Sequence, residues 1–418
     1  MSAQSVLADD FANQLDGFFP GCLPDRLVVA CSGGGDSLAL LDLTCRWAER
    51  FGTVIHAVTI DHGLRDGSAE EADTAAEIAA LLGASPTVLT WRGWQGQGNL
   101  QEAAREARRR LLSDYAREHE IHAVLLGHTL DDQAETFLLR LARGSGVDGL
   151  SGMALETDVD GVRFLRPLLS VRREVLRTHL RERGIDWAED PSNDDSRFDR
   201  VRMRKLLPLL AGNGLTVERL AATSDALRGA AEVVAVRAQE VARTCVSLEF
   251  GDVLIDRVSF AQIEEDTRNR IFAHALCWIS GNPRRPRLSA LKSVLSEVLR
   301  GGQATLHGCL IYQDGAGFCL TREYAAVSKV EVPVSEAWDG RWTVQSADDE
   351  RTIRALGEQG IEFIEKNERI APRETLFSMP SIWKDGQLVA VPFIGWGAKV
   401  SLTRHPDNSA FFSTLFSR

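Results

Sequence analysis

The segment that decides the fold is Leu27-Val-Val-Ala-Cys-Ser-Gly-Gly-Gly-Asp-Ser-Leu-Ala-Leu-Leu41. A short apolar run, typical of a buried strand, passes through three glycines into a helical pattern of leucines. Such a turn lets successive backbone N–H groups point into one concavity, and the helix N-terminus adds partial positive charge. The loop at 32–37 therefore predicts an anion site sized for phosphates. It contains neither GxxxxGK[ST] nor GxGxxG, so its residues exclude a Walker loop and a dinucleotide fingerprint.

Outward from this loop, strand and helix signals alternate through the first 210 residues. Further strands are predicted at 54–60, 88–90 and 123–127, and helices at 68–82, 100–119, 131–143, 170–183 and 198–210. Ser68-Ala-Glu-Glu71 has the spacing of a capping box, which predicts that Ser68 caps its helix. Repeated strand–helix units predict an α/β fold with a doubly wound, mainly parallel sheet. Ligands of such sheets bind beyond the carboxyl ends of the strands, where the loop at 32–37 lies.

The pattern changes after Ala211-Gly-Asn-Gly214, which is the predicted domain boundary. We expect three parts: an α/β domain at 1–212, a mostly helical region at 213–302 and a small β-rich domain at 303–418. The last part is expected to be β-rich because its apolar runs are short and punctuated by Gly and Asp.

The composition is that of an ordinary soluble chain. Its 418 residues are 44% hydrophobic and 26% charged, which excludes disordered and fibrous proteins. The net charge of −11 argues against non-specific coating of nucleic acid, although it leaves room for a local basic face. The N-terminus lacks the pattern of a signal peptide, and no run approaches the ~20 apolar residues of a membrane span. Seven scattered cysteines without a CxxC pair suit a reducing compartment, so we expect a cytoplasmic protein with no membrane partner.

Several motifs together resemble one family. The loop at 32–37 matches the SGGxDS signature of the PP-loop ATP pyrophosphatases. Residues 60–65 (IDHGLR) and 127–136 (GHTLDDQAET) resemble elements of the tRNA(Ile)-lysidine synthetases, as do 166–169 (RPLL) and 189–193 (EDPSN). The resemblance covers about residues 25–210, and it implies that 1–212 is a Rossmann-like, PP-loop ATP-binding catalytic domain.

The resemblance implies an ATP-dependent ligase that acts on tRNA(Ile) with a CAU anticodon. ATP would adenylate the C2 carbonyl oxygen of the wobble cytidine, and free L-lysine would then displace AMP to give lysidine, with pyrophosphate already released. Two alternatives stay open. One is a PP-loop tRNA thiolase, which the lack of a CxxC pair disfavours, and the other is a tRNA-binding protein that has lost catalysis.

ATP and Mg²⁺ are the cofactors that the resemblance implies. The expected ATP-binding residues are Ser32, Gly33, Gly34, Gly35, Asp36, Ser37, Asp61 and His62. Asp36 is expected to hold Mg²⁺, because this ion prefers one or two carboxylates together with phosphate oxygens and water. A helix N-cap is the other interpretation of Asp36, and a loop hydrogen bond is that of His62.

The lysine substrate must be bound as a cation and must lose a proton before its amine attacks. Asp131, Asp132 and Glu135 share one face at the start of a predicted helix, so we expect them to bind lysine. Carboxylates in a first helical turn are also favoured by the helix dipole alone. The expected catalytic residues are Asp36, Asp132, Glu135 and His128, and His128 competes with the carboxylates for the role of general base.

Basic helices provide the expected tRNA contacts, at Arg109, Arg200 and Arg204, although a solvated helix face is the default interpretation of such runs. The family pattern R-N-x-[IL]-R appears as RVRMR at 200–204, so Val201 stands where Asn is usual. This departure is the feature that favours the catalytically lost alternative. The resemblance also implies that the chain beyond 214 holds the tRNA body and that the protein forms a homodimer.

Overall fold

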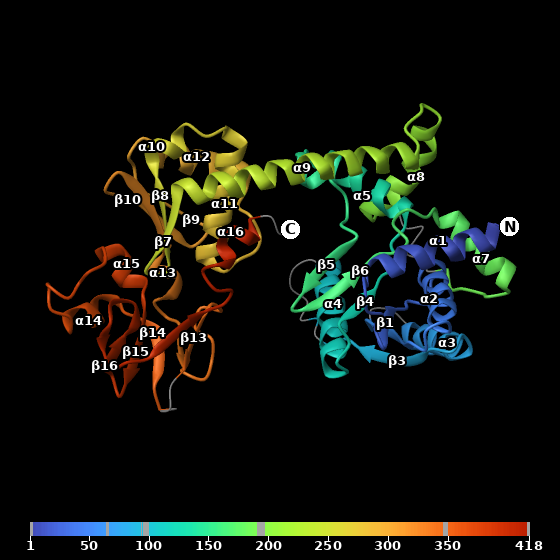
Figure 1. Cartoon of the computed structure of the whole chain (residues 1–418), viewed down its shortest axis with the longest axis horizontal. Helices are drawn as coiled ribbons and strands as arrows, with labels where there is room; N and C mark the ends of the chain where they lie inside the picture. The colour runs from blue at the N-terminus through green and yellow to red at the C-terminus, as the bar shows by residue number, and fades with distance from the viewer. Residues whose placement is uncertain are drawn as a thin grey trace. The chain divides into compact units, whose positions relative to one another are not determined.

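The computed structural model describes residues 3–63, 67–92, 94, 100–189, 197–345 and 350–415. The chain forms two compact units, Met1–Ala231 and Glu232–Arg418 (Figure 1). The division lies inside a helix of 29 residues, α9 (Val217–Cys245). The three-part domain division at 212 and 302 stays a prediction.

The first unit is built on one six-stranded sheet with the order β3-β2-β1-β4-β6-β5. Five of its strands are parallel, and β5 runs antiparallel to β6 at the edge. The strands are β1 (Arg26–Ala30), β2 (Val54–Asp61), β3 (Ser85–Thr90), β4 (Ala123–Leu125), β5 (Glu156–Val159) and β6 (Val162–Leu165). The helices before α9 are α1 (Ala3–Gly17), α2 (Gly35–Ala48), α3 (Ser68–Leu81), α4 (Leu100–Glu118), α5 (Leu130–Ala142), α6 (Val147–Leu150), α7 (Arg173–Arg183) and α8 (Asp199–Ala211).

Helices cover both faces of this sheet, as the alternation of side chains on β1 shows. Leu27 and Val29 belong to a core shared with α1, α2, α3 and α7, whereas Val28 and Ala30 belong to a second core shared with α4. Because both faces are buried, the strand is apolar at every one of these positions. The predicted doubly wound, mainly parallel α/β fold is confirmed.

The order of the strands reverses at β1, because β2 and β4 pair with its two opposite edges. In open α/β sheets, the crevice at the carboxyl ends on either side of such a reversal is where ligands bind. The loops that follow β1 and β4 meet there.

A buried polar cluster stabilises the packing of α2 against α7. Asp42 on α2 lies 2.7 Å from Nε2 of His179 and accepts a hydrogen bond of 3.1 Å from Arg183. Burial opposes ionisation of the Asp42 carboxyl, but the hydrogen bonds of His179 and Arg183 hold its pKa below the ordinary value.

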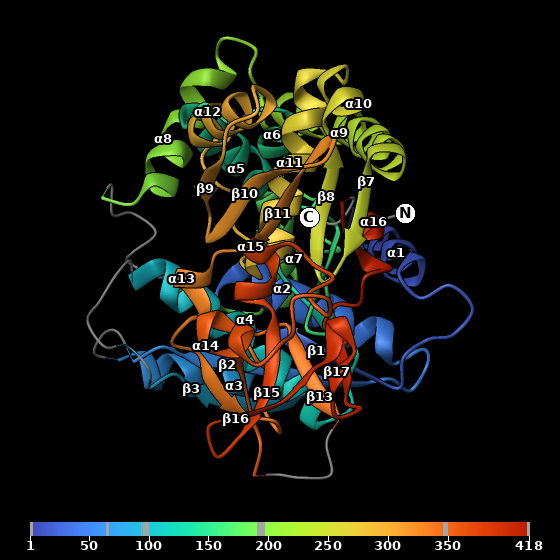
Figure 2. The same cartoon turned by 90° about the vertical axis from the view of Figure 1, so that its left-hand side faces the viewer.

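The second unit contains two five-stranded antiparallel sheets and a two-stranded pair. Figure 2 shows the strands of the first sheet side by side in the order β7-β8-β11-β10-β9. Its strands are β7 (Val246–Glu249), β8 (Asp252–Asp256), β9 (Ala304–Leu306), β10 (Cys309–Asp314) and β11 (Gly317–Arg322). The helices α10 (Arg257–Ala261), α11 (Glu265–Ser280), α12 (Leu288–Leu299) and the chain-terminal α16 (Ala410–Thr414) belong to the same unit.

The second sheet has the order β12-β14-β15-β16-β17, and β13 pairs with β18. These strands are β12 (Glu331–Pro333), β13 (Trp342–Gln345), β14 (Thr352–Ala355), β15 (Pro380–Lys384), β16 (Gln387–Val391), β17 (Trp396–Gly397) and β18 (Ser401–Arg404), with helices α13 (Tyr324–Val327), α14 (Gly357–Glu362) and α15 (Arg373–Ser378) and the 3₁₀ helix η2 (Pro392–Ile394) between them. The expected helical region and β-rich end are confirmed at the level of fold class. The hairpin β7–β8 was not expected within 213–302, and it joins the same sheet as β9–β11.

A buried carboxyl lies in the second unit. Asp252 on β8 accepts a hydrogen bond of 2.6 Å from the Thr375 hydroxyl, and burial raises the pKa of Asp252 to about 7.

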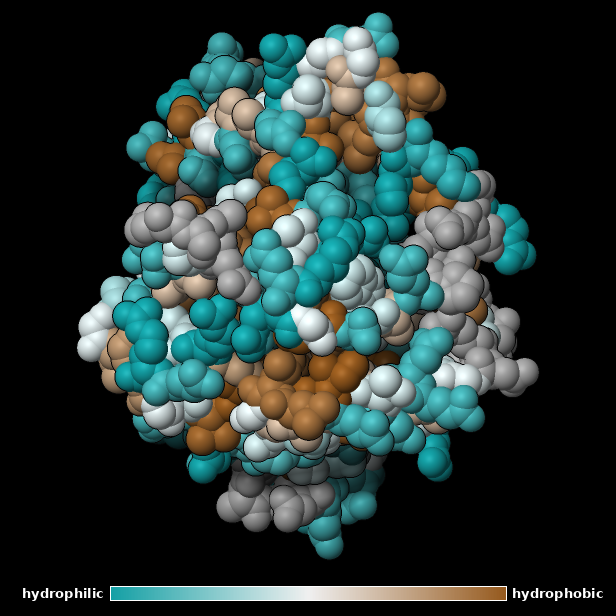
Figure 3. All heavy atoms as spheres, turned by 90° about the vertical axis from the view of Figure 1, so that its right-hand side faces the viewer, coloured by the Kyte–Doolittle hydropathy of each residue, from teal (hydrophilic) through white to brown (hydrophobic). Residues whose placement is uncertain are grey.

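The cysteines are all within the described residues, and all seven are free. Five are buried, Cys277 is half-buried and Cys22 is exposed. The face shown in Figure 3 is mainly hydrophilic, with a brown hydrophobic area in its lower half. None of the described helices has the length and apolar character needed to cross a membrane.

Candidate active site

The loop between β1 and α2 folds around the side chain of Ser37. Its Oγ accepts a hydrogen bond of 3.1 Å from the backbone N of Ser32 and lies 2.9 Å from the carbonyl oxygen of Gly34, to which it donates. Gly33 has a φ of +77°, and a Cβ there would lie 3.2 Å from Cβ of Ala75 on α3, so both conformation and space favour glycine. The first turn of α2 starts within this loop, so the predicted strand–loop–helix arrangement is present, and its role as an anion site stays a prediction.

The loop after β4 lies directly against the loop after β1. A Cβ added to Gly127 would lie 3.1 Å from the carbonyl oxygen of Asp36 and 3.2 Å from Cα of Ser37. This close approach brings His128 and the start of α5 next to the loop at 32–37, which is called the phosphate-type loop below. The two segments are far apart in the sequence but form one site.

A cavity of about 810 Å³ opens at this junction. The predicted site residues that line it are Ser32, Gly34, Gly35, Asp36, Ser37, His128, Asp132, Arg200 and Arg204. Half of the residues that line this cavity were therefore among the predicted site residues. Their roles in binding and catalysis remain proposals.

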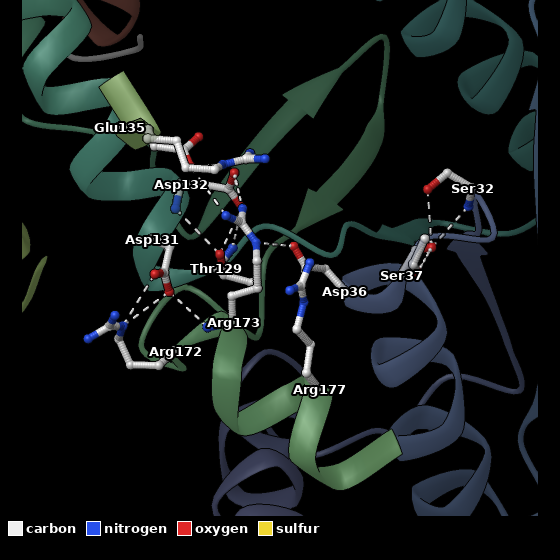
Figure 4. Close-up of polar contacts among 12 residues, drawn as sticks. Ser32, Asp36, Ser37, Thr129, Asp131, Asp132, Glu135, Arg172, Arg173 and Arg177 are labelled. Carbon is white, nitrogen blue, oxygen red and sulfur yellow. Dashed lines mark hydrogen bonds and ion pairs between the residues drawn. The ribbon is translucent and has the colours of Figure 1, made fainter. Parts of the chain in front are cut away.

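The carboxylates of α5 are held in different ways (Figure 4). Asp132 accepts hydrogen bonds from the backbone N and the hydroxyl of Thr129 at 2.8 and 2.9 Å, and so forms the capping box of α5. Asp131 instead accepts a hydrogen bond of 2.8 Å from the backbone N of Arg173 at the start of α7. Glu135 is completely buried, and its Oε2 has no hydrogen-bond partner among the described residues.

Arg173 connects these acids to the phosphate-type loop (Figure 4). Its guanidinium donates to Asp36 at 2.8 Å, to Asp132 at 3.0 Å and to Glu135 at 3.2 Å. Arg204 donates to the same Oε1 of Glu135 at 2.9 Å. A network of alternating charges thus joins the N-terminal turns of α2, α5 and α7 with α8.

A second cavity of about 470 Å³ lies beside the first, within the same unit. Asp131 and Glu135 line it together with apolar side chains from α8 and α9, among them Leu207 and Val217. Arg173 lines both cavities, as do Arg177 and Arg204. Carboxylates and an apolar wall are therefore combined at one place.

Burial and neighbouring charges shift the pKa values of the ionisable groups in the first cavity. Burial raises the pKa of Asp36 despite the opposing charge of Arg173. The pKa of Asp132 is lowered although burial opposes its ionisation, because the positive charge of Arg173 stabilises the ionised carboxylate. Burial lowers the pKa of His128 to about 3, so its imidazole is neutral at physiological pH.

Asp61 and His62 do not line either cavity. Asp61 accepts a hydrogen bond of 2.9 Å from the backbone N of Gly63, and its pKa is lowered mainly by that bond and by the Ser68 hydroxyl. His62 packs edge-on against Trp91, with ring centroids 5.7 Å apart. Their role in ATP binding stays a prediction, and residues 64 and 65 of the same motif lie outside the described residues, as do 190–193.

The predicted tRNA-contacting arginines have different environments. Arg109 is exposed on α4, Arg200 contacts the Thr136 hydroxyl at 3.5 Å, and Arg204 pairs with Glu135. Val201, which departs from the family pattern, is buried.

Three arginines of the first cavity, Arg108, Arg173 and Arg177, were not among the predicted site residues. Arg108 on α4 lines it next to the phosphate-type loop and contacts no carboxylate among the described residues. Burial lowers the pKa of Arg108, but the group stays cationic. The arginine-rich pattern of 105–110 marked this helix but not which arginine faces inward, and the pair of arginines at 172–173 carried no signal of its own.

Comparisons with known proteins agree with this geometry. Residues 7–210 match the family model described as the PP-loop domain. The chain is 39% identical over 415 residues to the tRNA(Ile)-lysidine synthase of Ruegeria pomeroyi, with 99% of both chains covered. It is 32% identical to that of Wolbachia pipientis wMel, covering 90% of each chain, and 38% identical to that of Hyphomonas neptunium, covering 72% of this chain and 84% of the relative.

Proposed function

The chain belongs to the family of tRNA(Ile)-lysidine synthases, and on that premise we propose that it ligates free L-lysine to C2 of the wobble cytidine in the CAU anticodon of tRNA(Ile). ATP first adenylates the C2 carbonyl oxygen and releases pyrophosphate, and the lysine amine then displaces AMP. The chain is an ATP-utilising PP-loop enzyme that modifies tRNA. The observation that supports the detailed proposal is the junction of the loops after β1 and β4, where a glycine-rich loop at a helix N-terminus and a cluster of carboxylates line one cavity.

ATP is proposed to bind with its phosphates on the loop at 32–37. The N-terminus of α2 and the guanidinium of Arg108 supply positive charge there. Asp36 is the proposed carboxylate for Mg²⁺. No group of three or more His, Cys, Asp or Glu among the described residues forms a metal site by itself, which suits an ion that takes most of its ligands from phosphate and water. Bound there, Mg²⁺ would neutralise charge on the departing pyrophosphate.

Lysine is proposed to occupy the second cavity, with its ammonium at Asp131 and Glu135 and its methylenes against Leu207 and Val217. Asp132 completes the proposed set from the side of the first cavity. The unpartnered Oε2 of Glu135 supports this residue as the acceptor of the lysine proton. His128 is neutral and its low pKa makes it a weak base, which favours a role as a hydrogen-bonding catalytic residue instead.

The anticodon loop is proposed to contact Arg200 and Arg204 at the cavity and the exposed Arg109 on α4. The second unit is proposed to hold the tRNA body. We further propose a cytoplasmic homodimer, which light scattering tests directly.

The decisive experiment is transfer of radiolabelled lysine to an unmodified CAU-anticodon tRNA(Ile) transcript, with and without ATP. A tRNA(Met) transcript with the same anticodon is the control. ATP-dependent labelling of tRNA(Ile) alone is expected. Tight tRNA binding without labelling would favour the catalytically lost alternative, and labelling of both transcripts would refute discrimination by the chain. Incorporation of sulfur instead of lysine would favour the thiolase alternative.

A further inference from the structure

One guanidinium is shared by carboxylates that the proposed reaction assigns to different ligands. Arg173 contacts Asp36, proposed for Mg²⁺, and also Asp132 and Glu135, proposed for lysine. The three carboxylates use three different nitrogens of the same group, Nε, Nη2 and Nη1 (Figure 4). A single side chain thus contacts carboxylates in both halves of the site.

Arg173 lies between the two cavities and shares Glu135 with Arg204. Its side chain is 16% exposed and lines both cavities, and the side chain of Glu135 is 0% exposed. A positive ligand that reaches Asp132 or Glu135 must therefore approach the space that the guanidinium fills.

We propose that Arg173 is a positioning residue that stands in for the cations of the reaction and leaves these carboxylates when the cations bind. This inference rests on the proposed function. In the ligand-free chain Arg173, together with Arg204 at Glu135, supplies the counter-charge without which burial of these carboxylates would be strongly destabilising. Lysine and the metal bring their own positive charge, so the carboxylates stay neutralised after the exchange.

The shape of the guanidinium couples the two ligands. Because the group is a rigid planar fork, its three ion pairs are broken together and not one at a time. The first cation to bind therefore bears the free-energy cost of moving Arg173, and the second finds the carboxylates already released. Such coupling must be reciprocal: Mg²⁺–nucleotide tightens lysine binding by the same factor by which lysine tightens nucleotide binding.

A permanent structural ion pair is the competing explanation. In that case Arg173 would stay in place, and its removal would disorder the carboxylates and weaken lysine binding. The stand-in role predicts the opposite change, because removal of a competing cation strengthens the binding of the real one.

The test uses the full chain with Arg173→Met, which removes the charge but retains much of the volume. Arg173→Lys is the second variant, because it keeps the charge and the fold but loses the fork. Arg117→Gln is the matched control: Arg117 lies on α4 of the same unit, pairs with Asp114 on the surface, and neither residue lines a cavity. Lysine affinity is measured by calorimetry with and without Mg²⁺ and a non-hydrolysable ATP analogue, and thermal unfolding is followed with lysine or with norleucine, which lacks the ammonium group.

In the wild type we expect the Mg²⁺–analogue complex to tighten lysine binding by about fivefold or more. When no nucleotide is present, Arg173→Met is expected to bind lysine more tightly than the wild type does. Addition of the Mg²⁺–analogue complex should then raise the lysine affinity of this variant by less than about twofold. Its lowered unfolding midpoint should be restored by lysine but not by norleucine, a rescue that a purely structural ion pair would not give. Arg173→Lys should show reduced coupling, and Arg117→Gln should match the wild type.

Weaker lysine binding by Arg173→Met, or unchanged coupling in Arg173→Lys, would overturn the stand-in role while leaving the proposed function intact. A wild-type chain that binds no lysine even with the analogue present would refute the proposed function itself.

Discussion

The contact between the loops after β1 and β4 provides a sharp test of how the site is aligned. Gly127→Ala adds one methyl group whose carbon would lie 3.1 Å from the carbonyl oxygen of Asp36 and 3.2 Å from its carbonyl carbon. Both neighbours are backbone atoms, so no side-chain rotation relieves the contact. Gly127 is not among the glycines with positive φ, so the substitution introduces little conformational strain and its effect is mainly steric.

The expected size of the effect follows from the overlap. Ordinary contacts begin near 3.4 Å, so the loop at 32–37 must move by a few tenths of an ångström away from α5. A misplacement of about 1 Å at a reacting centre costs on the order of a hundredfold in rate. We therefore expect tRNA-dependent pyrophosphate release to fall by about threefold to tenfold, and to fall further in Gly127→Val.

The assay measures pyrophosphate release at saturating ATP, lysine and CAU-anticodon tRNA(Ile), with melting curves to show that the fold is kept. Gly229→Ala on α9 is the matched control, because a Cβ at that glycine meets nothing within 4 Å. An unchanged rate in a folded Gly127→Ala protein would refute the idea that this contact aligns the ATP loop.

Three further predictions concern individual carboxyl groups. Asp36→Ala should abolish adenylation while tRNA affinity in a filter-binding assay stays within about twofold, since the lost group faces the cavity and not the basic surface; retained adenylation would contradict its role. Asp42 has a pKa below its ordinary 3.8, so its contribution to stability is present above pH 3.8 and is lost as the pH falls further. Asp42→Asn should therefore lower the denaturant midpoint at pH 7 and reduce the acid sensitivity of unfolding, and an unchanged pH profile would count against this role of Asp42. Asp252 has its pKa raised to about 7, so the contribution of its protonated carboxyl to folding stability is fully present below pH 3.8 and is lost as the pH rises to about 7. In calorimetric melts, Asp252→Asn should show a smaller loss of stability over this pH range. A pH dependence equal to that of the wild type would disprove this prediction.

The sheet and the phosphate-type loop could be predicted because their signals are local. Alternating strand and helix patterns, the run of glycines at 33–35 and the carboxylates of α5 are all readable within short windows of sequence. The family resemblance then connected these windows to one reaction, and the comparisons show that family.

Features that depend on contacts between distant segments were missed. Arg173 is separated from Asp36 by 137 residues, so no spacing rule marks the pair. The hairpin β7–β8 lies in a stretch of helical composition and exists because β8 pairs with β11. The capping box predicted at Ser68 was wrong: Gly67 is the N-cap, with no side-chain cap, and the Ser68 hydroxyl instead hydrogen-bonds to Asp61. A capping box was found at Thr129 and Asp132, where the sequence analysis expected lysine binding by Asp132 and gave the helix dipole as the alternative.

Because its thiols differ in exposure, the chain should be alkylated selectively. The thiolate is the reactive form, and burial raises the pKa of Cys45 and Cys309 to about 12 and that of Cys245 to about 11. Cys22, between α1 and β1, is the exposed thiol. A maleimide dye at neutral pH is therefore directed first to Cys22 on the ATP-binding unit, and the half-buried Cys277 is the next most accessible thiol. Cys22 thus provides a preferred position for surface attachment or single-molecule fluorescence without introducing a cysteine.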